Sequence, residues 1–334
     1  MQGRLENEMK LQQGTDELMK TLPNFVNEWY VNMKASRKTA SSCRDFAIKI
    51  RKFLLYLEDD PSKVKPEDIT LQACESYMIA CQTKTNNNGM IVFTSDSYQQ
   101  TVWYALNSLL KFMNKRNYIS HNYMEDIEKP KNRDLERINN ERILLTQRDF
   151  NKILNAAKNG NNFMNGIFRN RDVLIILLFM TTGMRRTALS EINISDIDFK
   201  DSQLVVIDKG NKRHEYILNE TVVQYIYDWL EDRKQLQTEK SGDALFINRD
   251  GDRISTHGIW EIVRKYCEEG IGKKLSPHKL RAGFCSILYN KTRDIEFVRR
   301  VVGHSSIGTT QRYIQTDGKE KEKAVQIMSD VLDI

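Results

Sequence analysis

The sequence lacks the features that mark several large classes of protein. Its five cysteines contain no CxxC pair and are odd in number, which predicts neither a disulfide framework nor a zinc site. We expect them to be core residues in a reducing compartment; they are Cys43, Cys74, Cys81, Cys267 and Cys285. The first twenty residues also lack the apolar stretch and small-residue cleavage site of a signal peptide. A cytoplasmic protein is expected.

Long hydrophobic runs and internal repeats are absent as well. The longest apolar run, residues 173–180, is far shorter than the ~20 residues that span a bilayer. It is better interpreted as a buried helix of a protein that does not enter a membrane.

Neither sign of charge dominates. Lysine and arginine number 51 against 45 acidic residues, so the net charge of +6 permits a nucleic-acid partner without demanding one. A length of 334 residues is enough for two domains, each with its own core.

Helical periodicity dominates the first third of the chain. Four segments place apolar residues three and four positions apart, so each should form a helix with one apolar stripe. The stripes begin at Leu22, Cys43, Cys74 and Tyr98, and they predict a small four-helix bundle. The segment TKTNNNGMIVFTSDS between the third and fourth stripes is polar and contains Gly89, and we predict a loop there.

A charge-dense stretch, EKPKNRDLERINNERI, then separates two domains. We assign residues 1–135 to a helical N-terminal domain, 136–144 to a linker and 145–334 to a second domain. Thr146, followed three residues later by Asp149, is typical of a helix N-terminus. The second domain should be mainly helical, with one β-hairpin formed by residues 204–208 and 215–218 around KGNKRH.

Four motifs of the second domain bear chemically useful side chains, and each is weak alone. TTGMRRTAL has two adjacent arginines, DKGNKRH has lysines at a hairpin, SPHKLRAGF has a His-x-x-Arg pair, and VVGHSSIGTTQRYIQ has Gly-His and a tyrosine. Helix-end arginines and turn lysines are usually just solvated. A His-x-x-Arg pair shares one face if its segment is a helix, but such pairs are mostly surface pairs.

Taken in order, however, the four motifs resemble the active-site signature of the tyrosine recombinases, also called phage integrases. The resemblance covers the chain from about Leu144 to its end, whereas the N-terminal helices match the family's core-binding domain only by type and position. It implies a mainly α fold with a small β-sheet: a helical core-binding domain and a mixed α/β catalytic domain. The catalytic residues that it implies are Arg185, Lys209, His278, Arg281, His304 and the nucleophile Tyr313.

The resemblance makes two nearby residues less suitable as catalytic candidates, and at one position the chain differs from the family's usual residue. Arg186 is a neighbour of the first arginine, and Lys212 is the other lysine of the hairpin motif. The family usually carries an acidic residue three positions after the first catalytic arginine, where this chain has Ala188.

The residue types suit transfer of a DNA phosphodiester to a side chain. Two arginines and a histidine can stabilise the charge that develops on the non-bridging oxygens, through forked, charge-assisted hydrogen bonds. Arg185, Arg281 and His304 fit that role.

Proton transfer accounts for the remaining three positions. A tyrosine hydroxyl with a pKa of about 10 is a poor nucleophile without a nearby base. His278 is the expected base for Tyr313, and Lys209 is the expected acid that protonates the departing 5′ oxygen. No metal or other cofactor is implied, because the cationic side chains supply the positive charge.

The resemblance also implies partners. Double-stranded DNA recombination sites are the expected substrate, and a homo-tetramer on two duplexes is the expected assembly, while the sequence does not reveal whether accessory proteins set the direction of the reaction. The tail has an apolar helical pattern from Ala324 to Leu332. It would pack on its own domain or, as often in the family, on a neighbouring protomer in a closed head-to-tail ring.

Three readings of the function remain open at this point. The first is a site-specific recombinase, either a mobile-element integrase or a Xer-type resolvase. A type IB topoisomerase shares the chemistry but joins no second duplex, and a DNA-binding protein with a relic active site would form no covalent adduct.

Overall fold

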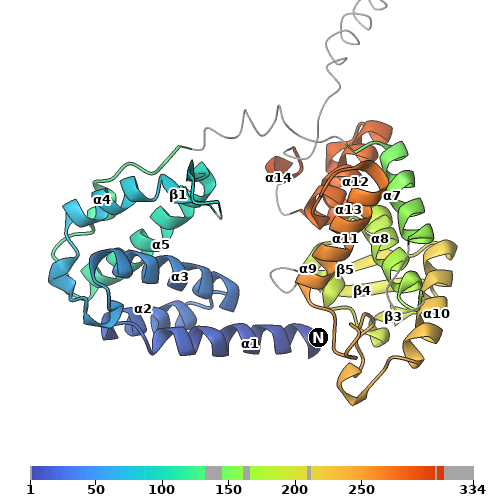
Figure 1. Cartoon of the computed structure of the whole chain (residues 1–334), viewed down its shortest axis with the longest axis horizontal. Coiled ribbons are helices and arrows are strands. Elements are labelled where there is room, and N and C mark those ends of the chain that lie inside the picture. The colour runs from blue at the N-terminus through green and yellow to red at the C-terminus, as the bar shows by residue number, and fades with distance from the viewer. Residues whose placement is uncertain are drawn as a thin grey trace, which may run out of the picture. The chain divides into compact units, whose positions relative to one another are not determined.

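The chain divides into two compact units, Gln2–Arg142 and Ile143–Ile334, which we call the N-terminal and C-terminal units. The structure, a computed structural model, describes residues 2–86, 88–131, 145–160, 166–208, 212–304 and 307–311. Figure 1 labels the helices and strands of both units. The expected linker over residues 136–144 lies outside the described residues.

Helices build the N-terminal unit. The described elements are α1 (Gln2–Met19), α2 (Asn24–Ala35), α3 (Ala40–Leu57), η1 (Pro61–Lys63), η2 (Pro66–Asp68), α4 (Leu71–Ala80), β1 (Thr83–Thr85), β2 (Ile91–Phe93), α5 (Asp96–Lys115) and η3 (Tyr123–Glu125). The four predicted stripes lie on α2 to α5 and line one core around the buried side chains of Trp29, Phe53 and Leu106. Side-chain caps fix several helix starts; Thr39 and Ser95, for example, accept hydrogen bonds from Ser42 N and Tyr98 N.

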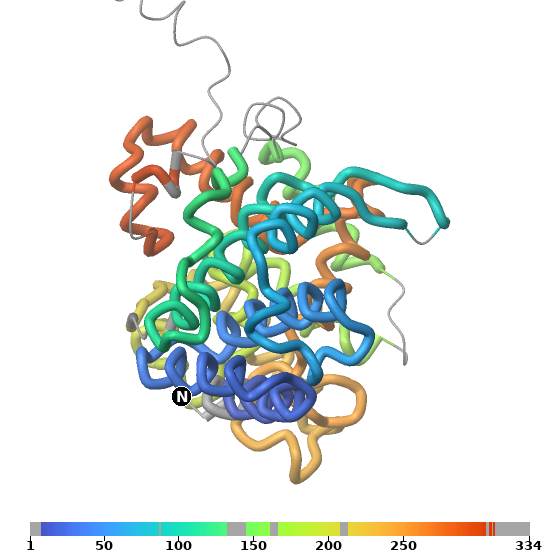
Figure 2. Tube along the Cα trace, turned by 90° about the vertical axis from the view of Figure 1, so that its left-hand side faces the viewer, coloured from blue at the N-terminus to red at the C-terminus, as the bar shows by residue number. Residues whose placement is uncertain are grey.

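Two features of this unit differ from the sequence prediction. A further helix, α1, precedes the predicted four and packs on α3; its apolar residues form no single face, so periodicity did not reveal it. The predicted loop is instead partly an antiparallel hairpin, in which Thr83 pairs with Phe93, and it extends from the unit in Figure 2. Neither strand has a buried residue, so no alternation of apolar and polar residues marked it.

The C-terminal unit combines helices with one small sheet. The described elements are α7 (Gln147–Asn159), α8 (Arg169–Thr182), α9 (Arg186–Ser190), η4 (Ile194–Asp196), β3 (Ile197–Asp198), β4 (Gln203–Asp208), β5 (Lys212–Ile217), α10 (Glu220–Lys234), η5 (Glu239–Ser241), α11 (Thr256–Ile271), α12 (Pro277–Thr292), α13 (Ile295–Val302) and α14 (Ile307–Gln311). The strands are antiparallel in the order β3-β4-β5. This confirms the predicted mainly α fold with a small β-sheet.

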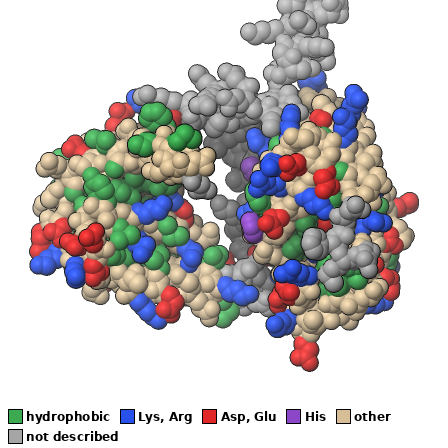
Figure 3. Space-filling model, in the orientation of Figure 1, with side chains coloured by type: hydrophobic (Ala, Val, Ile, Leu, Met, Phe, Trp, Pro, Cys, Tyr) green, Lys and Arg blue, Asp and Glu red, His purple; other side chains and the backbone are tan. Residues whose placement is uncertain are grey.

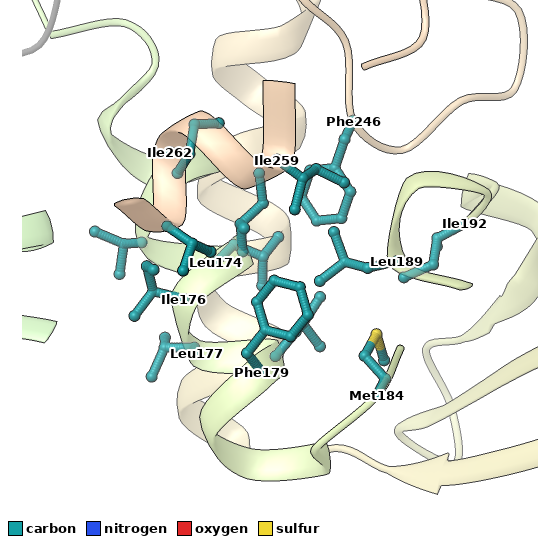
Figure 4. Packing of buried hydrophobic residues seen from close by; sticks show 14 of the residues in the cluster. Leu174, Ile176, Leu177, Phe179, Met184, Leu189, Ile192, Phe246, Ile259 and Ile262 are labelled. Atoms are coloured by element: carbon teal, nitrogen blue, oxygen red, sulfur yellow. The ribbon is translucent and has the colours of Figure 1, made fainter. Parts of the chain in front are cut away.

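Local sequence signals account for several of these elements. Thr146 and Asp149 form the predicted capping box of α7. The long apolar run lies in α8, which is buried on nearly all sides and packs against α9 and α11, as the labelled side chains in Figure 4 show. The predicted hairpin is present as β4 and β5, but β5 begins at Lys212 rather than Glu215, and β3 adds a strand that the sequence analysis did not predict.

All five cysteines are buried and carry free thiols, as expected of core residues. Burial raises the pKa of Cys285 to about 11 and that of Cys267 to about 12, so these thiols are protonated and unreactive at neutral pH. None of the described helices is long and apolar enough to cross a membrane.

Candidate active site

The first arginine motif follows a sharp turn at the end of α8. Gly183 ends the helix with φ +61°, and a Cβ placed on it would clash with the ring of Phe284. Both the left-handed backbone and the close approach require glycine. Met184 is fully buried after the turn, and Arg185 begins α9 as its N-cap. The turn therefore delivers a half-buried Arg185 to the site, whereas Arg186 is exposed.

Arg281 is the buried centre of the candidate site, with only 2% of its surface exposed. It lies one turn into α12, and its two terminal nitrogens donate to main-chain carbonyls, Nη1 to Gly183 at 2.5 Å and Nη2 to Val302 at 2.7 Å. Both carbonyls lie at helix C-termini, where the helix dipole places partial negative charge. One guanidinium thus joins the segment that leads to Arg185 with the segment that leads to His304.

His304 follows the C-terminus of α13 and is also buried, with 3% of its surface exposed. Its Nδ1 lies 3.0 Å from the hydroxyl oxygen of Thr310 on α14. Its main-chain carbonyl accepts a hydrogen bond of 2.8 Å from Arg299 Nη1, and Glu296 holds the other nitrogens of that guanidinium. Both the ring and the backbone of His304 are therefore held in place.

His278 lies in the first turn of α12, three residues before Arg281, which confirms that the two share a helix. Its side chain remains exposed to solvent on one side. The protein atoms around the ring lower its pKa below the ordinary 6.5, and the positive charges of Arg281, Lys279 and Arg185 lower it further. A neutral imidazole among fixed cations is suited to accept a proton at neutral pH.

The structure thus gathers four of the six predicted residues. Arg281 contacts the segments of Arg185 and His304, and the charges of both arginines act on His278. Figure 3 shows histidines among lysine and arginine side chains on the surface of the C-terminal unit. Lys209, Tyr313 and the tail stripe from Ala324 to Leu332 lie outside the described residues.

Three further residues contact the predicted site residues or the segments beside them: Thr310, Arg299 and His214. Thr310 lies in the motif GHSSIGTTQRYIQ, six residues after His304, and its place in that motif was the sequence signal that could have marked it. His214, on β5, contacts the main-chain carbonyl of Val301, and no pattern in the sequence indicated that. At the position where the family usually has an acid, Ala188 is buried and supplies no carboxylate.

The fold and these side chains together define a class of protein. Two arginines, one buried and one half-buried, a buried histidine and a solvent-facing neutral histidine are the groups needed to hold a phosphoryl group and move a proton beside it. Such a set of side chains is typical of phosphoryl-transfer enzymes. Across the described ranges, no three His, Cys, Asp or Glu side chains lie close enough to bind a metal ion together.

Comparison with known proteins specifies the family. Residues 144–320 match the model of the phage integrase family, so the chain belongs to that family. The chain is 34% identical to tyrosine recombinase XerC of Caldanaerobacter subterraneus over 65% of its length and 60% of that protein's length. It is 28% identical to tyrosine recombinase XerD of Staphylococcus epidermidis over 90% of its length and 97% of that protein's.

A solved structure shows the same fold. The XerH site-specific recombinase, bound to palindromic difH substrate in a post-cleavage complex, matches with a TM-score of 0.64 at 20% identity. The match covers 89% of this chain and 82% of that one. It therefore extends into the N-terminal helices, which by sequence matched the family's core-binding domain only by type and position.

Proposed function

We propose that this protein is a site-specific DNA recombinase that cuts and rejoins strands through a 3′-phosphotyrosine. The observation that carries the proposal is Arg281, which is buried and bonded to both segments that deliver Arg185 and His304. A buried arginine is costly unless its hydrogen bonds are satisfied, and here those bonds hold the two segments that would bring Arg185 and His304 to one phosphate.

In the cleavage step, the Tyr313 oxygen forms a bond to the scissile phosphorus, and the bond from phosphorus to the 5′ oxygen breaks. His278 accepts the tyrosine proton, and its lowered pKa keeps it unprotonated beforehand. Lys209 donates a proton to the departing 5′ oxygen. Arg185, Arg281 and His304 hold the non-bridging oxygens as negative charge develops on them.

Rejoining reverses these steps with a different strand. A 5′ hydroxyl gives its proton to Lys209 and attacks the phosphotyrosine, the bond from phosphorus to the Tyr313 oxygen breaks, and His278 returns a proton to that oxygen. No external energy source is needed, because the phosphotyrosine conserves the phosphodiester bond energy.

The two domains and the assembly follow from the same proposal. Residues 1–135 would be the core-binding domain and 145–334 the catalytic domain, with the linker between them letting both bind one duplex of recombination-site DNA. Four protomers on two duplexes would exchange strands, each tail helix docking on a neighbour. A gel-shift series with the chain ended after Gly318 should show single-site binding without the four-protomer complex; retention of that complex would argue against a docking tail.

We place the protein in the cytoplasm, where DNA and a reducing medium meet, because its five cysteines are free thiols. Integration or excision of a mobile element and resolution of chromosomes are all compatible with this chemistry. The DNA beside the gene would separate them: inverted repeats at an element boundary indicate an integrase, and a site near a replication terminus indicates resolution.

Replacement of Tyr313 by phenylalanine tests the function directly. Tyr313→Phe removes the attacking oxygen and leaves the DNA-binding surface intact, so covalent adduct on a nicked suicide substrate should vanish while gel-shift binding persists. Adduct at the wild-type level would exclude Tyr313 as the nucleophile, and absence of adduct from the wild type would indicate a relic site. Adduct without recombinant products from two duplexes would indicate a topoisomerase.

A further inference from the structure

His214 joins two parts of the C-terminal unit that the proposed chemistry must bring to the same phosphate. It lies on β5, in the hairpin whose turn carries Lys209 in the sequence. Its Nε2 lies 3.0 Å from the main-chain carbonyl of Val301, 87 residues further along the chain. Val301 lies in the last turn of α13, three residues before His304.

The chemistry of this contact specifies which nitrogen carries the proton. A main-chain carbonyl can only accept a hydrogen bond, so Nε2 of His214 must be the protonated donor. The carbonyl belongs to the last turn of a helix, where no further main-chain N–H of that helix is available to it. His214 therefore satisfies a helix end and fastens a strand to it in one bond.

The surroundings of the ring are shaped for this contact. The ring of His214 packs on Tyr216 with centroids 4.5 Å apart. A Cβ placed on Gly303 would lie 3.0 Å from Cε1 and from Nδ1 of His214, and Gly303 has φ +68°. Gly303 therefore both ends α13 and leaves room for the ring, which lies directly beside the residue preceding His304.

Three side chains contact main-chain carbonyls at the end of α13 or just beyond it. His214 donates to the carbonyl of Val301, Arg281 to that of Val302 and Arg299 to that of His304. Arg281, a predicted phosphate-binding residue, thus contacts the same helix end as His214, which belongs to the hairpin.

We infer that His214 is a positioning residue, which fixes the β4–β5 hairpin to the end of α13 so that the lysine of the hairpin reaches the same phosphate as His304. The inference rests on the proposed function, because it assigns His214 an effect on the departing 5′ oxygen through Lys209. If His214 only stabilised the fold, its loss would change the cleavage rate of every substrate by the same factor.

The experiment compares two nicked suicide substrates that differ in one atom. An ordinary phosphodiester needs a proton on the departing 5′ oxygen, whereas a 5′-bridging phosphorothiolate leaves readily without one. Single-turnover rates of adduct formation are measured for the wild type, His214→Ala, His214→Gln and Lys209→Ala. The matched control is Glu215→Ala, which removes the next, exposed side chain, on the opposite face of β5.

We expect His214→Ala to slow cleavage of the ordinary substrate about fivefold to tenfold, the scale of one lost hydrogen bond. On the phosphorothiolate its rate should return to within about twofold of the wild type, as that of Lys209→Ala should. His214→Gln keeps an N–H donor at a similar reach and should recover most of the ordinary rate. Glu215→Ala should match the wild type on both substrates.

Three results would overturn the inference. Equal loss on both substrates would show that His214 does not act through the leaving group, and the same rate as the wild type on both would show that the contact is dispensable. A Gln variant as slow as Ala, at an equal melting temperature, would exclude the hydrogen bond as the cause. If the wild type formed no adduct on either substrate, the proposed function itself would fall, so the two failures are distinguishable.

Discussion

The two units of this protein differ in how they treat buried charge. In the N-terminal unit the core is built by apolar stripes, and the buried polar residues found among its described side chains are Thr15, Lys49 and Asn122. The C-terminal unit buries three arginines in its described part: Arg171, Arg233 and Arg281.

Those three arginines are alike in burial and differ in what they bond. Arg171 pairs with Asp172 and donates to the carbonyl of Ile247. Arg233 donates to the carbonyls of Ala244 and Gly242. Arg281 alone among the three bonds the chain next to predicted site residues. Burial of an arginine therefore indicates a demanding structural role, and only its partners indicate a catalytic one.

The largest effect is expected when Arg281, rather than Arg233, is replaced by alanine. Arg281→Ala should slow covalent cleavage by more than about 10²-fold, because a donor to the developing charge is lost. It should also lower the free energy of unfolding by about 1–3 kcal/mol for each carbonyl left without its partner. Adduct formation and thermal unfolding measure the two effects.

Arg233→Ala is the matched control, since it too leaves buried carbonyls unpaired. It should lower the melting temperature while the rate per folded molecule stays near the wild type. Arg281→Lys keeps the positive charge but loses the forked guanidinium, so its cleavage rate per folded molecule should lie between those of the two alanine variants. Equal rates per folded molecule for the Arg281 and Arg233 alanine variants would reduce Arg281 to a structural residue.

A second comparison sharpens the assignment within the first motif. Arg185→Ala should slow cleavage by about 10²-fold, the scale of one lost charge-stabilising donor. Arg186 is exposed, so Arg186→Ala should cost far less. Single-turnover cleavage with saturating DNA measures both. A reversed order would mean that the motif had been aligned one residue out of register.

A smaller effect should appear in the pH dependence. The pKa of His278 lies below its ordinary 6.5 in the folded protein, so the base is unprotonated at neutral pH and cleavage should decline only below about 6.5. His278→Asn should remove that decline along with most of the rate. In the N-terminal unit, His121→Asn changes an exposed pair with Asp126 and should leave the profile unchanged.

The same shift makes a prediction about stability. The unfolded chain binds a proton at His278 more readily than the folded protein does, so this group lowers the free energy of unfolding as pH falls below 6.5. The loss should end once the pH passes below the folded-state pKa. Denaturant titrations of wild type and His278→Asn across this range would show the wild-type curve falling more steeply; parallel curves would contradict the assignment.

The smallest effect is expected in the N-terminal unit. Trp103 Nε1 donates to the carbonyl of Ile127 at 3.0 Å, and Trp103→Phe removes that bond. Unfolding of this unit should become easier by about 1 kcal/mol, with no change in the cleavage rate at saturating DNA. Denaturant unfolding and adduct formation are the measurements. A slower chemical step at saturation would show that this unit takes part in more than binding.

The sequence predicted best those features that depend on neighbouring residues. Helix stripes repeat every three or four positions, so α2, α3, α4 and α5 were evident, whereas α8 was marked by its continuous apolar run. The Thr146–Asp149 capping box marked the start of α7. Exposed elements were less evident: the β1–β2 hairpin buries neither of its faces, and α1 has no clear apolar face. Without a buried face there is no periodic pattern to detect.

The sequence by itself also predicted which side chains would form the site, because the four motifs follow in the order of the family's active-site signature. Only the tertiary structure decided how those side chains are held. Arg281 reaches Gly183 and Val302, and His214 reaches Val301, across 98, 21 and 87 residues of sequence. Each of these bonds ends on a main-chain carbonyl. Every residue has such a carbonyl, so no pattern of residue types can reveal which one will accept the bond until the chain has folded.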